Sequence, residues 1–323
     1  MRSEGGSKVA VDKKLSLMPG PHIRKEVSIE KIMYLFSLAL MLPAGASIFL
    51  FGRHALFIIL TSVLSAVFTE YIAKRIRRQR FRMDGSALIT GLLLALTLPP
   101  RLPLWMVALG AVFAIAVAKE AFGGLGYNIF NPALAGRAFL TACFPKEMTR
   151  WVLPFGAVTS PTPLNNGFVW HNGKIALYKH LFLGNVGGSL GETSALLILI
   201  AGFLLLALGI IDWRIPLCYI GTVALLTFSF GKDPLFHVLA GGLMFGAFFM
   251  ATDYVTTPIT GKGRIIFAAG AGVLTVMIRL FGGMPEGVCF SILLMNAFTP
   301  LIDRYVRPRP FGWRKTDEQK RGS

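Results

Sequence analysis

The residues with the clearest chemical potential form a short hydroxyl-rich stretch, Thr159-Ser160-Pro161-Thr162. It stands in a polar segment, residues 144–190, between two blocks of apolar sequence. A threonine hydroxyl can be esterified by a phosphate group, and a loop is open to a modifying enzyme. A turn rich in Pro and Ser explains the same residues without any chemistry. The stretch is therefore a candidate modification site, with a plain turn as the alternative.

A second candidate is the glycine-rich segment Gly123–Pro132. Its glycines allow unusual backbone angles and Pro132 lacks an amide donor, so the segment cannot be an unbroken helix. Broken backbone at membrane depth is tolerated where it lines a cavity or is buried in protein. Asn128 and Asn131 could then hold an ion or the polar edge of a cofactor. A close helix–helix contact through small residues is the alternative.

Three charged residues lie in or beside apolar runs and are candidates for an ion path or an anion site. Glu192 falls in the first turn of an expected helix, where it could also be only a capping residue. Asp253 follows an apolar run and is a candidate ion ligand. Arg137 lies within a run and needs a partner, which could be an acidic side chain or a phosphate.

The composition requires a lipid environment. The 323-residue chain is 54% hydrophobic with a mean hydropathy of +0.62, and only 15% of its residues are charged. Apolar runs near the ~20 residues that span a bilayer recur along it. The net charge of +17 lies between those runs, as the positive-inside rule expects, so we predict a lipid bilayer and no nucleic acid as its surroundings.

The remaining reactive residue types are scattered. Cys143, Cys218 and Cys289 have no close spacing and suit packing roles. The five histidines form no metal-binding cluster, and neither a nucleophile–base pair nor a nucleotide-binding Walker pattern is present. We therefore assign no catalytic or metal-ligating residue within the chain.

The elements that must position these residues are predicted to be about ten transmembrane helices in an all-α membrane protein. The spans are 32–52, 55–74, 86–98, 103–122, 129–143, 191–211, 215–230, 235–252, 264–281 and 286–304. They leave an N-terminal arm (1–31), a first membrane half (32–143), the segment 144–190, a second half (191–304) and a tail (305–323). An even number of spans places both termini on one side. Because the basic arm, the run Lys74–Arg82 and the tail share that side, it is predicted to be cytoplasmic, and the hydroxyl-rich stretch faces outward.

An internal repeat is visible at an offset of 159 residues. Phe122-Gly123-Gly124 maps onto Phe281-Gly282-Gly283, and Ala138-Phe139 maps onto Ala297-Phe298. Five spans separate the two copies, and an odd number inverts the second copy in the membrane. We therefore predict two inverted five-helix repeats, an architecture of transporters whose sites lie between the halves. Chance similarity among Gly-rich membrane helices is the alternative.

These segments together resemble the family of RnfD and NqrB, membrane subunits of ion-translocating electron-transport complexes. The segments that carry the resemblance are Phe122–Phe139, Gly187–Ala195, Ala251–Pro258 and Arg279–Val288, with Pro21-His22 near the start. The likeness runs from about residue 15 to 310, and the length is closer to RnfD.

The resemblance implies a covalent flavin. Family members hold FMN through a phosphoester to a threonine in a motif close to Asp-x-x-Ser/Thr-Gly/Ser-Ala-Thr, and a separate flavin transferase makes the bond. The matching stretch is Gly156–Thr162, which puts Thr162 at the acceptor position. Gly156 stands where the family has Asp, and Pro161 where it has Ala. A second, non-covalent flavin is implied among the helices, with Asn128, Asn131 and Arg137 as its expected lining.

The function implied is a flavin-bearing subunit of an Rnf-type complex in a bacterial or archaeal cytoplasmic membrane. Such a complex passes electrons between ferredoxin and NAD and moves sodium ions or protons. The chain would be one part of this redox-driven translocase, whose catalysis needs the other subunits. Its partners would include a second flavin-bearing subunit and the subunits on the ferredoxin and NAD side. The alternative is an inverted-repeat channel or secondary transporter without redox chemistry.

Overall fold

The computed structural model describes residues 28–81, 83–156, 162–164, 173–282 and 287–307. The described elements are helices and their connections. In the N-terminal part they are α1 (Ile29–Phe51), α2 (Arg53–Ile76), α3 (Ser86–Leu96), α4 (Leu104–Ala116), the 3₁₀ turn η1 (Glu120–Phe122), α5 (Pro132–Cys143) and α6 (Pro145–Met148). The C-terminal part has α7 (Lys174–Leu183), α8 (Ala195–Ala207), α9 (Arg214–Ser229), α10 (Pro234–Leu239), α11 (Leu243–Phe245), the π-helical turn η2 (Gly246–Met250), α12 (Gly261–Phe281) and α13 (Val288–Tyr305).

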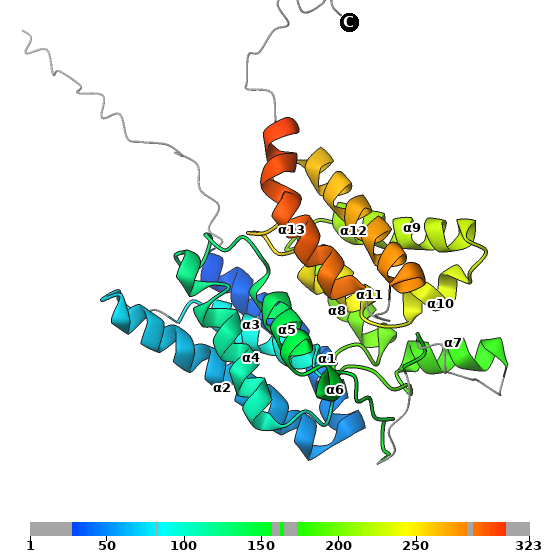
Figure 1. Cartoon of the computed structure of the whole chain (residues 1–323), viewed down its shortest axis with the longest axis horizontal. Helices are drawn as coiled ribbons and strands as arrows, with labels where there is room; N and C mark the ends of the chain where they lie inside the picture. Colours follow the sequence, from blue (N-terminus) through cyan, green and yellow to red (C-terminus); the bar gives the residue numbers. More distant parts are fainter. Residues whose placement is uncertain (1–27, 82, 157–161, 165–172, 283–286, 308–323) are drawn as a thin grey trace, which may run out of the picture.

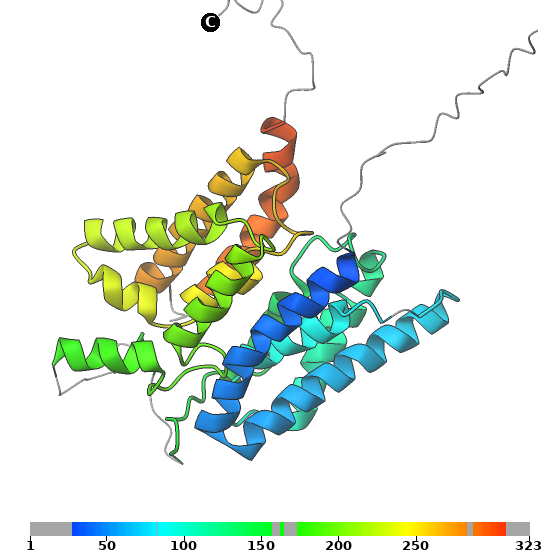
Figure 2. The same cartoon turned by 180° about the vertical axis from the view of Figure 1, so that it is seen from behind.

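The helices form two bundles that lie side by side, as both views show (Figure 1, Figure 2). In the first bundle α2 packs on α3 and α4, and α4 packs on α5. In the second bundle α12 packs on α9 and α13. The bundles meet where α1 contacts α8 and where α5 contacts α13.

The apolar side chains support a multi-pass membrane protein. Four helical segments are long and apolar enough to cross a membrane: Ile29–Phe51, Arg53–Ile76, Leu104–Phe122 and Gly261–Phe281. Shorter apolar helices are Ser86–Leu96, Ala195–Ala207 and Arg214–Ser229. Large apolar side chains such as Phe49, Leu64 and Phe228 are exposed on these helices. Lipid tails would cover such side chains, whereas a water-soluble monomer rarely exposes so many.

The predicted spans and the observed helices differ in several places; α5 begins at Pro132 and α8 at Ala195, each a few residues later than predicted. The predicted span 235–252 is broken into α10, α11 and η2, because Gly241 adopts a positive φ of 68° that interrupts the helix. The polar segment 144–190 contains the helices α6 and α7. Residues 1–27 of the N-terminal arm, the C-terminal tail beyond residue 307, Thr159–Pro161 and Gly283 of the repeat lie outside the described residues, and the last three residues of the predicted arm belong to α1.

The two ends of the described chain lie on the same side of the molecule. α1 begins, and α13 ends, toward the top of Figure 1, whereas α6 and α7 lie toward the bottom. Thr162 lines a pocket together with Leu181 of α7, so it lies near that helix.

Candidate functional site

Thr162 is buried in a narrow pocket next to the second bundle. Its side chain is 5% exposed, and its Oγ1 has no hydrogen-bond partner among the described residues. Glycines at 187, 188 and 241 line the same pocket, which has a volume of about 20 Å³. A Cβ placed on Gly188 would meet no atom within 4 Å, so the pocket has free space on that side. A pocket of this size accepts one small group beside the hydroxyl.

The loop from Gly184 to Ser194 builds one wall of this pocket. Gly184 ends α7 with a positive φ of 101°, and a Cβ there would lie 2.8 Å from the carbonyl oxygen of Thr193. The amides of Leu190 and Gly191 donate to the carbonyls of Leu98 and Leu96 at the end of α3. These bonds tie the loop of the second bundle to the first bundle.

Glu192 has a different position from the one predicted. α8 begins at Ala195 with Ser194 as its N-cap, so Glu192 precedes the helix and is not in its first turn. Its side chain is 5% exposed, and its Oε1 accepts from Nη1 of Arg137 at 3.3 Å. Within the described chain its Oε2 has no hydrogen-bond partner.

Arg137 therefore has the acidic partner that a buried arginine requires. It lies in α5, and its side chain is 8% exposed. Removing one member of such a pair would leave a buried, uncompensated charge. Because Glu192 also lines the pocket of Thr162, the pair and the hydroxyl form one site on this side of the molecule.

Asn128 and Asn131 belong to a separate place. Asn131 is the N-cap of α5, and its Oδ1 accepts from the amides of Ala133 and Leu134. Its Nδ2 donates to Met250 O at 3.3 Å, and its backbone amide donates to Oδ1 of Asn296. Asn128 donates to Phe130 O within its own turn. Asn131 therefore joins the two bundles, which adds a structural role to the predicted ligand role.

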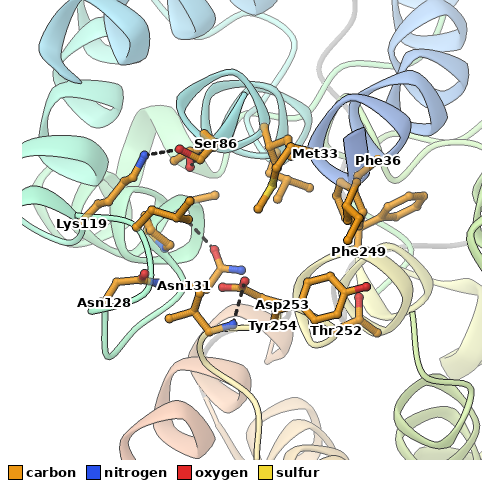
Figure 3. Close-up of a pocket in the computed structure, with 18 residues that line it drawn as sticks. Met33, Phe36, Ser86, Lys119, Asn128, Asn131, Phe249, Thr252, Asp253 and Tyr254 are labelled. Atoms are coloured by element: carbon orange, nitrogen blue, oxygen red, sulfur yellow. Dashed lines mark hydrogen bonds between the residues drawn. The ribbon is translucent and has the colours of Figure 1, made fainter. Parts of the chain in front are cut away.

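A cavity lies between the bundles beside these two asparagines (Figure 3). Its volume is about 80 Å³, on the same measure that gives about 20 Å³ for the pocket of Thr162. Most of its lining is apolar, with Phe36 from α1 and Phe249 from η2 as aromatic walls. Asp253 lines it as well, accepting from Val255 N at 3.4 Å and from Thr256 Oγ1 at 3.2 Å. The structure thus brings Asn128, Asn131 and Asp253 together, and separates them from Arg137, Glu192 and Thr162.

Sequence reasoning missed a buried ion network at the edge of this cavity. Lys119 and Glu70 are each 2% exposed, and the Lys119 ammonium donates to Oε1 of Glu70 at 2.8 Å. It also donates to Oγ of Ser86 at 2.6 Å. Both charged residues fall inside predicted spans, and a charge within an apolar run is a signal of function that could have identified them.

The fold and these sites define a class: a multi-pass helical membrane protein with buried charged pairs and a mostly apolar cavity between two bundles. A family model described as the NQR2, RnfD, RnfE family matches residues 16–312. The chain is 49% identical to the D subunit of the proton-translocating ferredoxin:NAD(+) oxidoreductase complex of Clostridium ljungdahlii, covering 93% of this chain and 97% of that protein.

Two further relatives are also D subunits of ion-translocating complexes. The D subunit of the Na(+)-translocating ferredoxin:NAD(+) oxidoreductase complex of Acetobacterium woodii is 44% identical over 94% of this chain and 98% of its own length. The D subunit of an ion-translocating oxidoreductase complex of Methanosarcina acetivorans is 36% identical over 92% of this chain and 97% of its own length. The chain belongs to the NQR2, RnfD, RnfE family, which confirms the resemblance found in the sequence.

Proposed function

We propose that the chain is the flavin-bearing D-type membrane subunit of a complex that couples electron transfer between ferredoxin and NAD to sodium or proton translocation. Similarity to relatives named as such subunits over nearly their whole length supports the class of complex. The observation that carries the flavin assignment is the Thr162 hydroxyl, which is buried and has no partner within the described chain. The other subunits of the complex would be its partners, and the membrane a bacterial or archaeal cytoplasmic membrane.

Thr162 would hold FMN through a phosphoester at Oγ1, made by a flavin transferase. The free hydroxyl supplies the acceptor atom, and the pocket beside it, which has room for about one water molecule, would have to widen for the phosphate group. The pocket is too small for the three-ring flavin, so the rings would lie outside it. The Glu192 carboxylate is a like charge for the phosphate, and its pairing with Arg137 offsets the repulsion. Bound flavin would supply one- and two-electron transfer.

The cavity between the bundles is the proposed site of the second, non-covalent flavin. Pockets of this kind are mostly apolar with a few polar groups that orient the ligand. Asn128, Asn131, Asp253 and Lys119 are such polar groups here. The Asp253 carboxylate can accept from a ring N–H, and the Lys119 ammonium can donate to a carbonyl.

An inverted ten-helix repeat is also part of the proposal. The packing of α2 on α4 and of α4 on α5 has a counterpart in the packing of α9 on α12 and of α12 on α13. Phe122, the last residue of η1, and Phe281, the last residue of α12, are separated by the repeat offset of 159 residues. The start of α1 and the end of α13 lie on the same side of the molecule, which agrees with both termini being cytoplasmic. Thr162 would then lie on the outer side.

The decisive experiment is fluorescence of the denatured subunit. The complex is purified from the native host, where the transferase is present, and the subunit is separated on a denaturing gel and weighed intact. We expect flavin fluorescence and the added mass of one FMN in the wild type, and their complete loss in Thr162→Ala.

Two matched variants test whether the loss of fluorescence is specific to position 162. Thr159→Ala changes the other threonine of the motif. Thr193→Ala removes a buried hydroxyl from the same pocket, one that donates to Leu190 O. Both variants should keep the fluorescence. A colourless native complex would instead favour a channel or secondary transporter, which the broken helix over α10, α11 and η2 also suits.

A further inference from the structure

Lys119 is the most deeply buried ammonium group that borders the cavity between the bundles. It follows α4 in a turn that leads to η1, and its side chain is 2% exposed. Lysine is almost never fully buried unless its charge is paired. Figure 3 shows Lys119 reaching the cavity edge next to Ser86, away from Asp253. The lysine therefore places a fixed positive charge at one end of a largely apolar cavity.

The network behind Lys119 holds the ammonium in place and pairs two lysines, Lys119 and Lys74, with two acids, Glu70 and Asp84. Lys119 and Lys74 both bind Oε1 of Glu70, at 2.8 and 3.0 Å, so two cations share one carboxylate oxygen. The second acid, Asp84, lies 3.8 Å from Lys74 and accepts from Ser86 rather than from Lys119. Of these four charged groups only Lys119 lines the cavity, so its ammonium is the one nearest to a bound ligand.

One N–H donor of the Lys119 ammonium is available to a ligand. An ammonium has three N–H donors. Within the described chain two of them are directed to Glu70 Oε1 and Ser86 Oγ. Because Lys119 lines the cavity, the third can reach an acceptor atom of a molecule bound there.

We propose that Lys119 is a positioning residue that makes the cavity prefer the reduced form of a planar, conjugated redox ligand. The inference rests on the proposed second flavin. Lys119 donates its remaining hydrogen bond to a carbonyl or ring-nitrogen acceptor of the ligand. Each electron that the ligand gains adds one negative charge, which the fixed ammonium stabilises. The low polarity of the surrounding aromatic and aliphatic walls strengthens that attraction.

The test uses the intact purified complex and the flavin that acid precipitation releases from it. Leu125→Trp fills the cavity from a half-buried lining residue and should remove one releasable flavin per complex. Lys119→Met should lower the preference for the reduced flavin at least tenfold, about 59 mV for a one-electron couple. Spectroelectrochemical titration of each complex measures this shift.

Matched variants distinguish the effect of a charge at the cavity on the flavin potential from the effect of a charge elsewhere in the network. Lys74→Met also removes a cation from Glu70, but Lys74 does not line the cavity, so the potential should stay at the wild-type value. Lys119→Arg keeps the charge and should keep the potential. If Lys119→Met alone does not assemble, the double variant K119M/E70Q removes both buried charges and should still lower the potential.

The outcomes distinguish the two proposals. Loss of flavin in Leu125→Trp with equal potentials in Lys119→Met and Lys74→Met overturns the role of Lys119 and leaves the cavity flavin standing. Full retention of releasable flavin in Leu125→Trp overturns the cavity flavin and, with it, the role of Lys119.

Discussion

At the residue scale, the buried charges of this protein are organised as pairs and small networks. Arg137 binds Glu192, Lys119 binds Glu70, and Arg77 binds Glu120. Burying a charge without a partner costs several kcal/mol, so buried charges in a membrane protein are expected to be paired with opposite charges. The buried Thr162 hydroxyl has neither an ion-pair nor a hydrogen-bond partner within the described chain.

Asp212 lies outside the membrane spans, and its carboxyl should make the stability of the folded protein depend on pH. Burial alone would raise the pKa of this carboxyl, but the Arg214 amide and the Arg264 guanidinium, 2.7 Å away, lower it below its usual value. A carboxyl whose folded pKa is lowered stabilises the fold above its unfolded pKa of about 3.9, and this contribution is lost as the pH falls through the folded pKa. Asp212→Asn should therefore lower stability by about 1 kcal/mol at pH 7.

The measurement is the thermal unfolding of the detergent-purified complex over a pH range that extends to well below the unfolded pKa of about 3.9. The difference between wild type and Asp212→Asn should be constant above that pKa and shrink below it. A difference that stays constant at the lowest pH would contradict the role of the ionised carboxylate. Asp303→Asn is a suitable control, because within the described chain Asp303 accepts only from the amide of Ile259.

At the element scale, glycines set how closely the helices approach. In α5, a Cβ on Gly136 would lie 2.8 Å from the carbonyl oxygen of Gly110 and 2.9 Å from Cβ of Ala114, both in α4. Small residues at such contacts let membrane helices pack backbone to backbone. This close contact lies at Gly136 and not in the glycine-rich segment Gly123–Pro132, where a Cβ added at Gly123 or Gly124 would meet the nearby side chain of Tyr127 or Glu120.

Gly136→Ala should destabilise the protein because α4 and α5 would have to separate. Overpacking of this kind costs about 1–3 kcal/mol. Gly221→Ala is the matched control: Gly221 lies in α9, and its added Cβ would meet nothing within 4 Å. The control should be neutral or stabilise by up to about 1 kcal/mol, since alanine favours the helix. Thermal unfolding of both variants tests this, and equal melting temperatures would refute the close contact.

At the scale of the whole molecule, a few polar bonds fix how the two bundles meet. Asn296 in α13 accepts from the Asn131 amide of the first bundle and donates to Thr256 O of the second. Leu190 and Gly191 bind the end of α3 from the other side. These bonds frame the cavity, so its shape depends on the relative position of the bundles.

Asn296→Leu should loosen this junction. It leaves the buried Asn131 amide without its acceptor, at a cost of about 1–3 kcal/mol, whereas the Thr256 carbonyl keeps the hydrogen bond from Thr299. Hydrogen exchange should speed up at Asn131 and at the start of α5. Thr299→Val is the matched control, because Thr299 donates to the same Thr256 carbonyl and, among the described residues, makes its hydrogen bonds within the second bundle. Equal exchange at Asn131 in both variants would contradict a junction held by Asn296.

The sequence by itself determined the membrane class, the approximate positions of the helices and the family. These follow from hydropathy, from the spacing of Gly and Pro, and from local motifs, all of which act over neighbouring residues. Each predicted span has a helical segment in the structure, although Gly241 breaks one of them into short pieces. The need of Arg137 for a partner was also predictable, because it follows from one buried charge.

Tertiary structure alone decided which residues share a site. The partner of Arg137 comes from a loop 55 residues away, and Asn131 meets Asn296 across 165 residues. In the sequence Lys119 is a single charge near a helix end, and only the fold brings Glu70 and Ser86 beside it. Such pairings arise from the packing of two bundles, and no local pattern encodes which buried charge or amide will face which other.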